Sequence, residues 1–228
     1  MKTCFAPALI AGTLSVCASY SLAEPFSIDF GFQSGVPSLD FAGASTLQNP
    51  QSGIWLIPTT DNNVIDFKGL LDTSFSSTDV HLRSDRALNW VSNPGVFGDP
   101  DTVGLVADGI EIGLPTLRSG AVTLTLDNIN NGFYEVVTYT APFLDLSAVV
   151  EVTINGESKT GGGAFPPTFF VEGVTHTRHQ LEITDNLLIM EYEPVSGFGV
   201  INGFQIIPIP SPATLSPLAM MLYIPRRR

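Results

Sequence analysis

Two tryptophans and two asparagines are the residues of this chain whose types best suit recognition of a sugar. Trp55 and Trp90 both lie near turn-forming residues, and Asn89 and Asn93 flank Trp90. A flat aromatic ring packs against the C–H face of a sugar, and a side-chain amide donates and accepts hydrogen bonds. These four residues predict a carbohydrate site. The alternative is that both tryptophans pack into a core at the ends of a sheet.

A second candidate is the densest group of carboxylates in the chain. Asp99, Asp101 and Asp108 follow one another closely, and Glu111 comes soon after. Calcium takes oxygen ligands, and an acidic domain attracts it. The spacing differs from that of the Asp-x-Asp-x-Asp-Gly calcium loop. The group therefore predicts either a calcium site at the three aspartates or a set of solvated loop carboxylates.

Patterns for catalysis are weak. Glu191 and Glu193 lie two apart in a predicted strand, whereas glycosidases place two carboxylates about 5 to 9.5 Å apart across a cleft. His176 and His179 are three apart, so in a strand their rings lie on opposite faces. The sequence has no Gly-x-Ser-x-Gly elbow, no phosphate-binding glycine loop and no His-Glu-x-x-His. It therefore predicts a protein that is not an enzyme.

Charge and composition narrow the possible partners and the fold class of this protein. The 228 residues include 22 acidic and 10 basic side chains, which gives a net charge of −12. A field of this sign repels phosphate backbones and disfavours nucleic acid as a partner. Charged residues make up only 14% of the chain, alongside 21 Gly and 17 Pro. This composition is typical of short strands joined by turns.

The elements that must position these residues are predicted to be strands. Val122, Leu124 and Leu126 alternate with threonines, and Asn130–Gly132 supplies turn residues before the next run, which predicts a hairpin. Asp185-Asn186 is the clearest two-residue turn signal. Turn signals about 8 to 15 residues apart favour an all-β antiparallel β-sandwich with about nine to eleven strands, and no apolar-periodic window is long enough to predict a helix. The other runs are 26–30, 54–57, 80–83, 133–140, 149–154, 181–184, 187–192 and 200–207.

The first 23 residues have the layout of a secretory signal peptide. Lys2 precedes an apolar run, Phe5–Val16, that is too short to span a bilayer, and a small residue, Ala23, marks the expected cleavage site. Cleavage there removes Cys4 and Cys17 and leaves a mature chain without disulfides or thiolate metal ligands. The alternatives are an apolar first strand, or a lipoprotein modified at Cys17.

The C-terminal segment is the most specific feature of the sequence. Its motif and basic end comprise Pro210, Ser211, Pro212, Ala213, Thr214, Arg226, Arg227 and Arg228. This segment resembles the sorting signal of PEP-CTERM proteins, in which a Pro-Glu-Pro-Ala-Thr-like motif, an apolar helix and a basic end are handled by a membrane transpeptidase, exosortase. The terminal arginines fit the positive-inside preference. Ser211 stands where the motif has glutamate, and Pro217 interrupts an apolar run of about 16 Å. A plain proline-rich C-terminus is the alternative.

Short motifs across the middle of the chain are similar to those of galactose-binding or malectin-like jelly rolls. They are Ile28–Gly31, Gly132–Val136, Asn155-Gly156, Asp185–Leu187 and Ile201–Ile206. The resemblance implies that the first and last strands pair and that loops at one end of the sandwich hold a sugar.

Together these observations predict a signal peptide at 1–23, a β-sandwich domain at 24–208 and a sorting tail at 209–228. We expect a non-catalytic protein that is exported by the general secretory pathway to the cell surface or extracellular matrix, with a transient exosortase-type partner and an extracellular polysaccharide as ligand. A purely structural surface protein, or a secreted glycoside hydrolase or lyase, is the alternative. No cofactor is expected apart from calcium.

Overall fold

The computed structural model describes eleven stretches of the chain, and every structural statement below concerns these alone. They are 25–31, 37, 43–44, 55–56, 60–61, 63–72, 76–92, 99–113, 120–143, 145–163 and 170–209. The predicted signal peptide and sorting motif, and Asn93, lie outside the described residues. Of β2 (Trp55–Leu56) and β3 (Thr60–Asp61) only the backbone is described.

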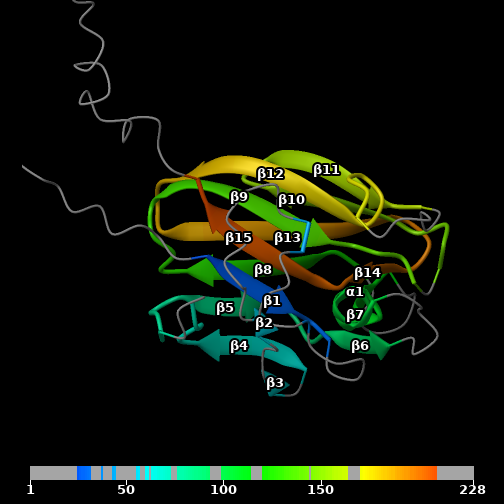
Figure 1. Ribbon diagram of the computed structural model, residues 1–228, viewed down its shortest axis with the longest axis horizontal. Helices are drawn as coiled ribbons and strands as arrows, with labels where there is room; N and C mark the ends of the chain where they lie inside the picture. The colour runs from blue at the N-terminus through cyan, green and yellow to red at the C-terminus, as the bar shows by residue number, and fades with distance from the viewer. Residues whose placement is uncertain are drawn as a thin grey trace, which may run out of the picture.

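Two antiparallel sheets form the body of the domain (Figure 1). One has five strands in the order β12 (His176–Ile183), β9 (Gly132–Tyr139), β15 (Gly203–Pro208), β1 (Phe26–Asp29) and β2, of which β2 joins β1 in parallel. The other has seven, in the order β11 (Glu157–Gly162), β10 (Val149–Ile154), β13 (Leu187–Ser196), β8 (Val122–Asp127), β5 (His81–Ser84), β4 (Val64–Lys68) and β3. A small third sheet contains β14 (Gly199–Ile201), β7 (Asp108–Ile112) and β6 (Asn89–Ser92).

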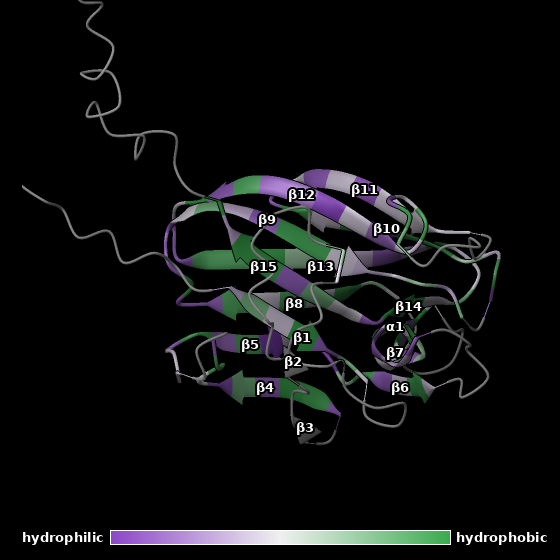
Figure 2. Ribbon diagram, viewed as in Figure 1, coloured by the Kyte–Doolittle hydropathy of each residue, from purple (hydrophilic) through white to green (hydrophobic). Residues whose placement is uncertain are grey.

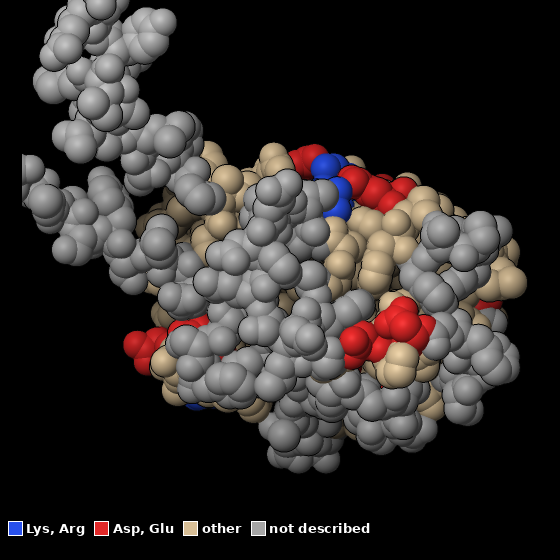
Figure 3. Space-filling model, in the orientation of Figure 1, with Lys and Arg blue, Asp and Glu red and all other residues tan. Residues whose placement is uncertain are grey.

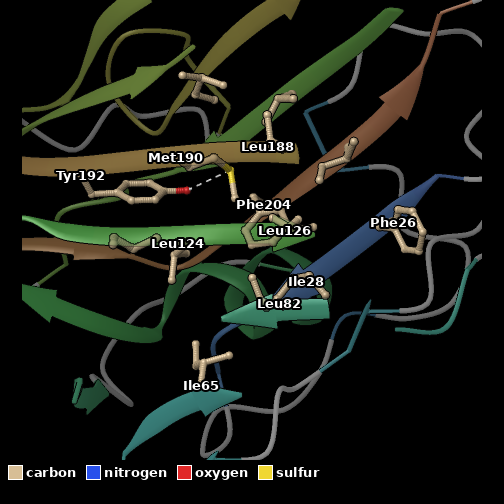
Figure 4. Close-up of a cluster of buried hydrophobic side chains, with 14 of the residues drawn as sticks. Phe26, Ile28, Ile65, Leu82, Leu124, Leu126, Leu188, Met190, Tyr192 and Phe204 are labelled. Atoms are coloured by element: carbon tan, nitrogen blue, oxygen red, sulfur yellow. Dashed lines mark hydrogen bonds between the residues drawn. The ribbon is translucent and has the colours of Figure 1, made fainter. Parts of the chain in front are cut away.

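The core lies between the two large sheets, as the alternation predicted. Along β8, Val122, Leu124 and Leu126 are buried while the threonines between them are half-buried, because successive strand residues point to opposite faces. They pack with Ile28 and Phe204 of the five-stranded sheet (Figure 4). Green apolar segments in Figure 2 recur on strands of both sheets. The all-β sandwich is thereby confirmed.

Pairing of the first and last strands is also confirmed. β1 and β15 are antiparallel neighbours, with Phe26 opposite Ile206 and Asp29 opposite Gly203. The predicted last strand is divided at Asn202, where the chain leaves the small sheet as β14 and enters the five-stranded sheet as β15.

The predicted hairpin through Asn130–Gly132 is wrong. β8 belongs to the seven-stranded sheet and β9 to the five-stranded sheet, so the turn crosses between sheets instead of joining neighbours. The turn at Asp185-Asn186 crosses in the same way from β12 to β13. Asn186 binds the first turn, since its backbone N–H donates to Asn131 Oδ1 at 2.8 Å. By contrast, Asn155-Gly156 does close a true hairpin between β10 and β11.

A short helix interrupts the strands, although the sequence predicted none. α1 runs from Pro100 to Val106, and the Asp99 side chain caps it by accepting hydrogen bonds from Thr102 N at 3.0 Å and Thr102 Oγ1 at 2.6 Å. An Asp-Pro start of this kind is a helix signal, but seven residues are too few to show apolar periodicity. In the described parts of the chain, no helix has the length and hydrophobicity to cross a bilayer.

Candidate functional site

Of the predicted sugar-binding residues, Asn89 and Trp90 lie at the corner formed by β6, α1 and β7, whereas Trp55 lies on β2. Asn89 and Trp90 on β6 lie opposite Glu111 and Ile110 on β7. The Asn89 Nδ2 atom donates a hydrogen bond to Glu111 Oε2 at 2.5 Å, and both side chains are at least half-buried. This amide and carboxylate pair leaves further donors and acceptors for hydroxyl groups.

Trp90 is shared between this corner and the core. Its ring is half-buried and meets the Phe30 ring edge-on, with centroids 6.2 Å apart and an interplanar angle of 68°. The ring therefore packs in part against the core, as expected if Trp90 is a core residue rather than a sugar-binding one. The Trp55 backbone on β2 lies opposite Ser27 of β1. Trp55 thus lies on the strand that pairs with β1, and Trp90 packs on the residue that directly follows β1, although the two tryptophans are 35 residues apart in the sequence.

The three aspartates of the predicted calcium site are not brought together. Asp99 and Asp101 stand at the start of α1, where acidic side chains gather at the surface (Figure 3). Asp108 follows the other end of this helix, which is about 10 Å long, and is fully buried. Asp99 is already the helix cap, and hydrogen bonds from Thr102 hold the pKa of its carboxyl below the usual value. The described residues contain no group of three or more His, Cys, Asp or Glu side chains that can hold a metal ion.

The structure instead places Asp108 beside Asp29, a residue that the sequence did not single out. Both carboxyl groups are fully buried. Asp29 Oδ1 accepts a hydrogen bond from Gly31 N at 2.8 Å. Burial raises the pKa of Asp29 well above its usual value, and the Asp108 carboxylate raises it further. The signal in the sequence was the alternation of Phe26, Ile28 and Phe30 with polar residues, which put Asp29 on the outer face without showing that this face is covered.

Asn202 connects this corner to the five-stranded sheet. Its Nδ2 donates to the backbone oxygens of Val106 at 3.2 Å and Asp108 at 2.9 Å, and its Oδ1 accepts from Ala141 N at 2.7 Å. Its backbone N–H donates to Tyr139 O at 2.9 Å. A single buried amide therefore joins the end of α1, the start of β7 and the end of β9. This explains why an asparagine stands in the Ile201–Ile206 motif.

A second buried polar network lies on the outer face of the five-stranded sheet. The Tyr139 hydroxyl donates to Gln205 Oε1 at 2.5 Å and accepts from Ala44 N at 2.7 Å. Arg178 Nη2 donates to Ala44 O at 2.6 Å, and Arg178 Nε lies 3.5 Å from Glu135 Oε2. Glu135 is fully buried, so Arg178 supplies the charge that balances it.

The residues considered for catalysis are in different settings. Glu191 and Glu193 are exposed on the outer face of the seven-stranded sheet, and Glu193 lies directly opposite Glu151. His176 is buried beside Tyr139 and Phe170, and burial lowers its pKa to about 4. Burial also lowers the pKa of His179. Both imidazoles are therefore neutral near pH 7.

No protein-family model matches the chain, and no curated protein matches it. Among solved structures, it is similar to a β-glucuronidase of Bacteroides uniformis (12% identity, TM-score 0.44, 81% of this chain and 18% of that one). It is also similar to a chain in the complex of the plant peptide RALF23 with FER and LLG2 (12% identity, TM-score 0.45, 84% of this chain and 41% of that one). A third similar structure is TmCBM61 in complex with beta-1,4-galactotriose (11% identity, TM-score 0.31, 57% of this chain and 88% of that one). This chain therefore spans less than half of the first two. Likeness this distant says nothing of its ligand.

Proposed function

We propose that this protein is a non-catalytic β-sandwich, exported to the cell surface or extracellular matrix, that binds carbohydrate along the flank of β1. This flank comprises Trp55, Trp90, Asn89 and Glu111. The observation that carries the proposal is that one of the two tryptophans of the chain, Trp55, lies on the strand paired with β1, and the other, Trp90, packs on Phe30 directly after β1 with a hydrogen-bonded amide and carboxylate beside it. Aromatic surface flanked by such groups is the chemistry that a sugar requires.

The flank is supported by a rigid sheet. The Trp55 backbone lies opposite Ser27 of β1, and the Trp90 ring packs on Phe30, the residue that follows this strand. β1 pairs with β15 over four residues, and the Phe30 N–H donates to Asn202 O at 2.8 Å. Binding groups held by a sheet keep their spacing better than groups on loops.

The directions of the strands support surface attachment. β1 and β15 are antiparallel, so the chain enters β1 and leaves β15 at the same end of the sandwich (Figure 1). The corner of β6 and β7 lies near the other end of β1, where Asp29 meets Asp108. A C-terminal anchor of the PEP-CTERM type, handled by an exosortase-type transpeptidase, would hold the corner of β6 and β7, with Asn89, Trp90 and Glu111, away from the membrane.

The proposal is tested by pull-down of the purified protein with a panel of soluble and insoluble polysaccharides, with and without calcium. Saturable binding is expected, and Trp55→Ala and Trp90→Ala are each expected to weaken it at least tenfold. Phe133→Ala is the matched control, because Phe133 is an exposed aromatic residue on β9 rather than on this flank. Circular dichroism confirms that each variant folds.

A structural surface protein without a ligand is the second candidate, and the packing of Trp90 on Phe30 favours it. In that case no polysaccharide is retained, and Trp90→Ala lowers the unfolding midpoint as a core truncation does. Absence of binding to the whole panel would therefore contradict the carbohydrate proposal.

A further inference from the structure

The outer face of β1 carries a carboxyl group that is closed off from water and faces a second one. A Cβ on Gly31 would lie 2.0 Å from Asp108 Oδ1 and 3.0 Å from Asp29 Oδ1. Both carboxyl groups therefore surround the same small space, which a glycine at position 31 leaves open. Two ionised carboxylates at this range in a buried site repel each other strongly.

Little in the described structure stabilises a negative charge on Asp29. One oxygen accepts the Gly31 N–H, while Oδ2 has no hydrogen-bond partner among the described residues. The groups that face it are Asp108 on β7, the Gly31 N–H that follows β1, and the backbone of Gly203 on β15. No Lys, Arg or His of the described residues contributes to the pKa of Asp29, which burial raises most.

We propose that Asp29 keeps its proton in the folded protein and donates it from Oδ2 to the carboxylate of Asp108. Asp29 ends β1 and Asp108 begins β7, so this single proton joins the five-stranded sheet to the small sheet. A hydrogen bond from a neutral acid to a carboxylate is short and strong. The pair then carries one negative charge instead of two.

A bound cation would be the other way to hold two carboxylates together. Calcium takes six to eight oxygen ligands, with carboxylates supplying much of the charge. The described residues offer two carboxyl groups at this point and no group of three that can hold a metal ion. The geometry therefore favours a proton over a metal ion.

A shared proton has a defined effect on stability. In the folded protein Asp29 holds a proton. In the unfolded chain Asp29 is ionised at any pH above its ordinary pKa of 3.8. Unfolding then releases one proton, so the unfolding equilibrium constant rises tenfold for each pH unit until the pH passes the pKa of the folded state. Asp29→Asn has an N–H that donates to Asp108 as the acid does, but it has no proton to lose.

The test is chemical denaturation of the purified full-length protein at a series of pH values from about 5 to 8. The wild type is expected to lose stability with a slope one proton steeper than that of Asp29→Asn. Asp99→Asn is the matched control, because it removes the charge of an exposed aspartate and asparagine also caps helices. It should keep the wild-type slope.

Infrared spectroscopy of the wild type gives a measurement that needs no variant. A carbonyl band of a protonated carboxyl group should be present at neutral pH and shift in heavy water. Absence of this band would overturn the proposal, as would a slope in Asp29→Asn equal to that of the wild type. A fall in melting temperature on adding a chelator, reversed by calcium, would show that a cation occupies the pair.

Discussion

Two carboxyl groups on the outer face of the same sheet are buried in opposite electrostatic settings. Glu135 on β9 has Arg178 beside it, whereas Asp29 on β1 has another acid, Asp108. A buried carboxylate is tolerated when a cation balances it, and otherwise the group holds a proton. The comparison shows that position in the sheet does not decide the charge of a buried acid; the residue that faces it does.

The largest expected effect comes from removing the cation of the first site. Arg178→Met leaves Glu135 buried without its counter-charge and should lower the free energy of unfolding by about 3 to 5 kcal/mol. Denaturant titration measures this. Glu135→Gln in the same chain should recover a large part of the loss. Arg83→Met, which breaks an exposed pair with Asp127, is the control and should cost at most about 1 kcal/mol.

Asn202 tests whether the two sites are coupled, because it binds the corner through Asp108 O and the end of β9 through Tyr139 O and Ala141 N. Asn202→Leu leaves buried backbone groups unsatisfied and should cost about 2 to 4 kcal/mol. A double-mutant cycle with Arg178→Met measures the coupling. An additive result would mean that the sites are independent.

The two sites should also fail at opposite ends of the pH scale. His176, beside Tyr139, has a pKa lowered by burial from 6.5 to about 4. Below pH 6.5 the unfolded chain binds this proton while the folded protein does not, so stability falls as the pH drops from 6.5 towards 4, by about 1 to 2 kcal/mol. Denaturation of His176→Gln over this range should show a weaker fall. An equal fall in both proteins would contradict the assignment.

The smallest effect is expected from two acids that water reaches, the exposed Glu193 and the half-buried Glu151. Glu151 and Glu193 lie directly opposite on β10 and β13, where water screens them without removing their repulsion. Glu193→Thr should stabilise the domain by about 0.2 to 1 kcal/mol in low salt, and by less in high salt. Glu182→Thr, on the other sheet opposite Phe133, is the control and should change little.

The strands of the sandwich could be predicted because alternation is a local pattern. The alternation of apolar residues and threonines in Val122–Leu126 predicted which face of this strand is buried. The resemblance to galactose-binding or malectin-like jelly rolls predicted that the first and last strands pair. The hairpin predicted at Asn130–Gly132 was wrong, since a turn residue fixes a local bend but not the sheet that the next strand joins. The turn predicted at Asp185-Asn186 is present between β12 and β13, and it too joins two different sheets. The helix at Pro100 was too short to show periodicity.

The candidate site could be predicted only in part. The sequence predicted Asn89 and Trp90 as site residues from their amide and aromatic side chains. It did not predict that Asn89 contacts Glu111 or that Trp90 contacts Phe30, because these partners lie elsewhere in the chain. The alternation along β1 put Asp29 on the outer face but gave no sign of its burial, which depends on neighbours such as Asp108, 79 residues away. Local spacing records which face a residue takes, and only the folded chain shows what covers that face.

The position of β15 has a mechanical consequence. β15 lies between β9 and β1, and the chain leaves it at Pro208. If the C-terminus is tethered and a ligand is held near the far end of β1, a pulling force runs along these strands rather than across them. The hydrogen bonds that β15 makes with its two neighbours then carry the load together, in shear. Such a domain would resist detachment by flow through slow forced unfolding, whatever its equilibrium stability.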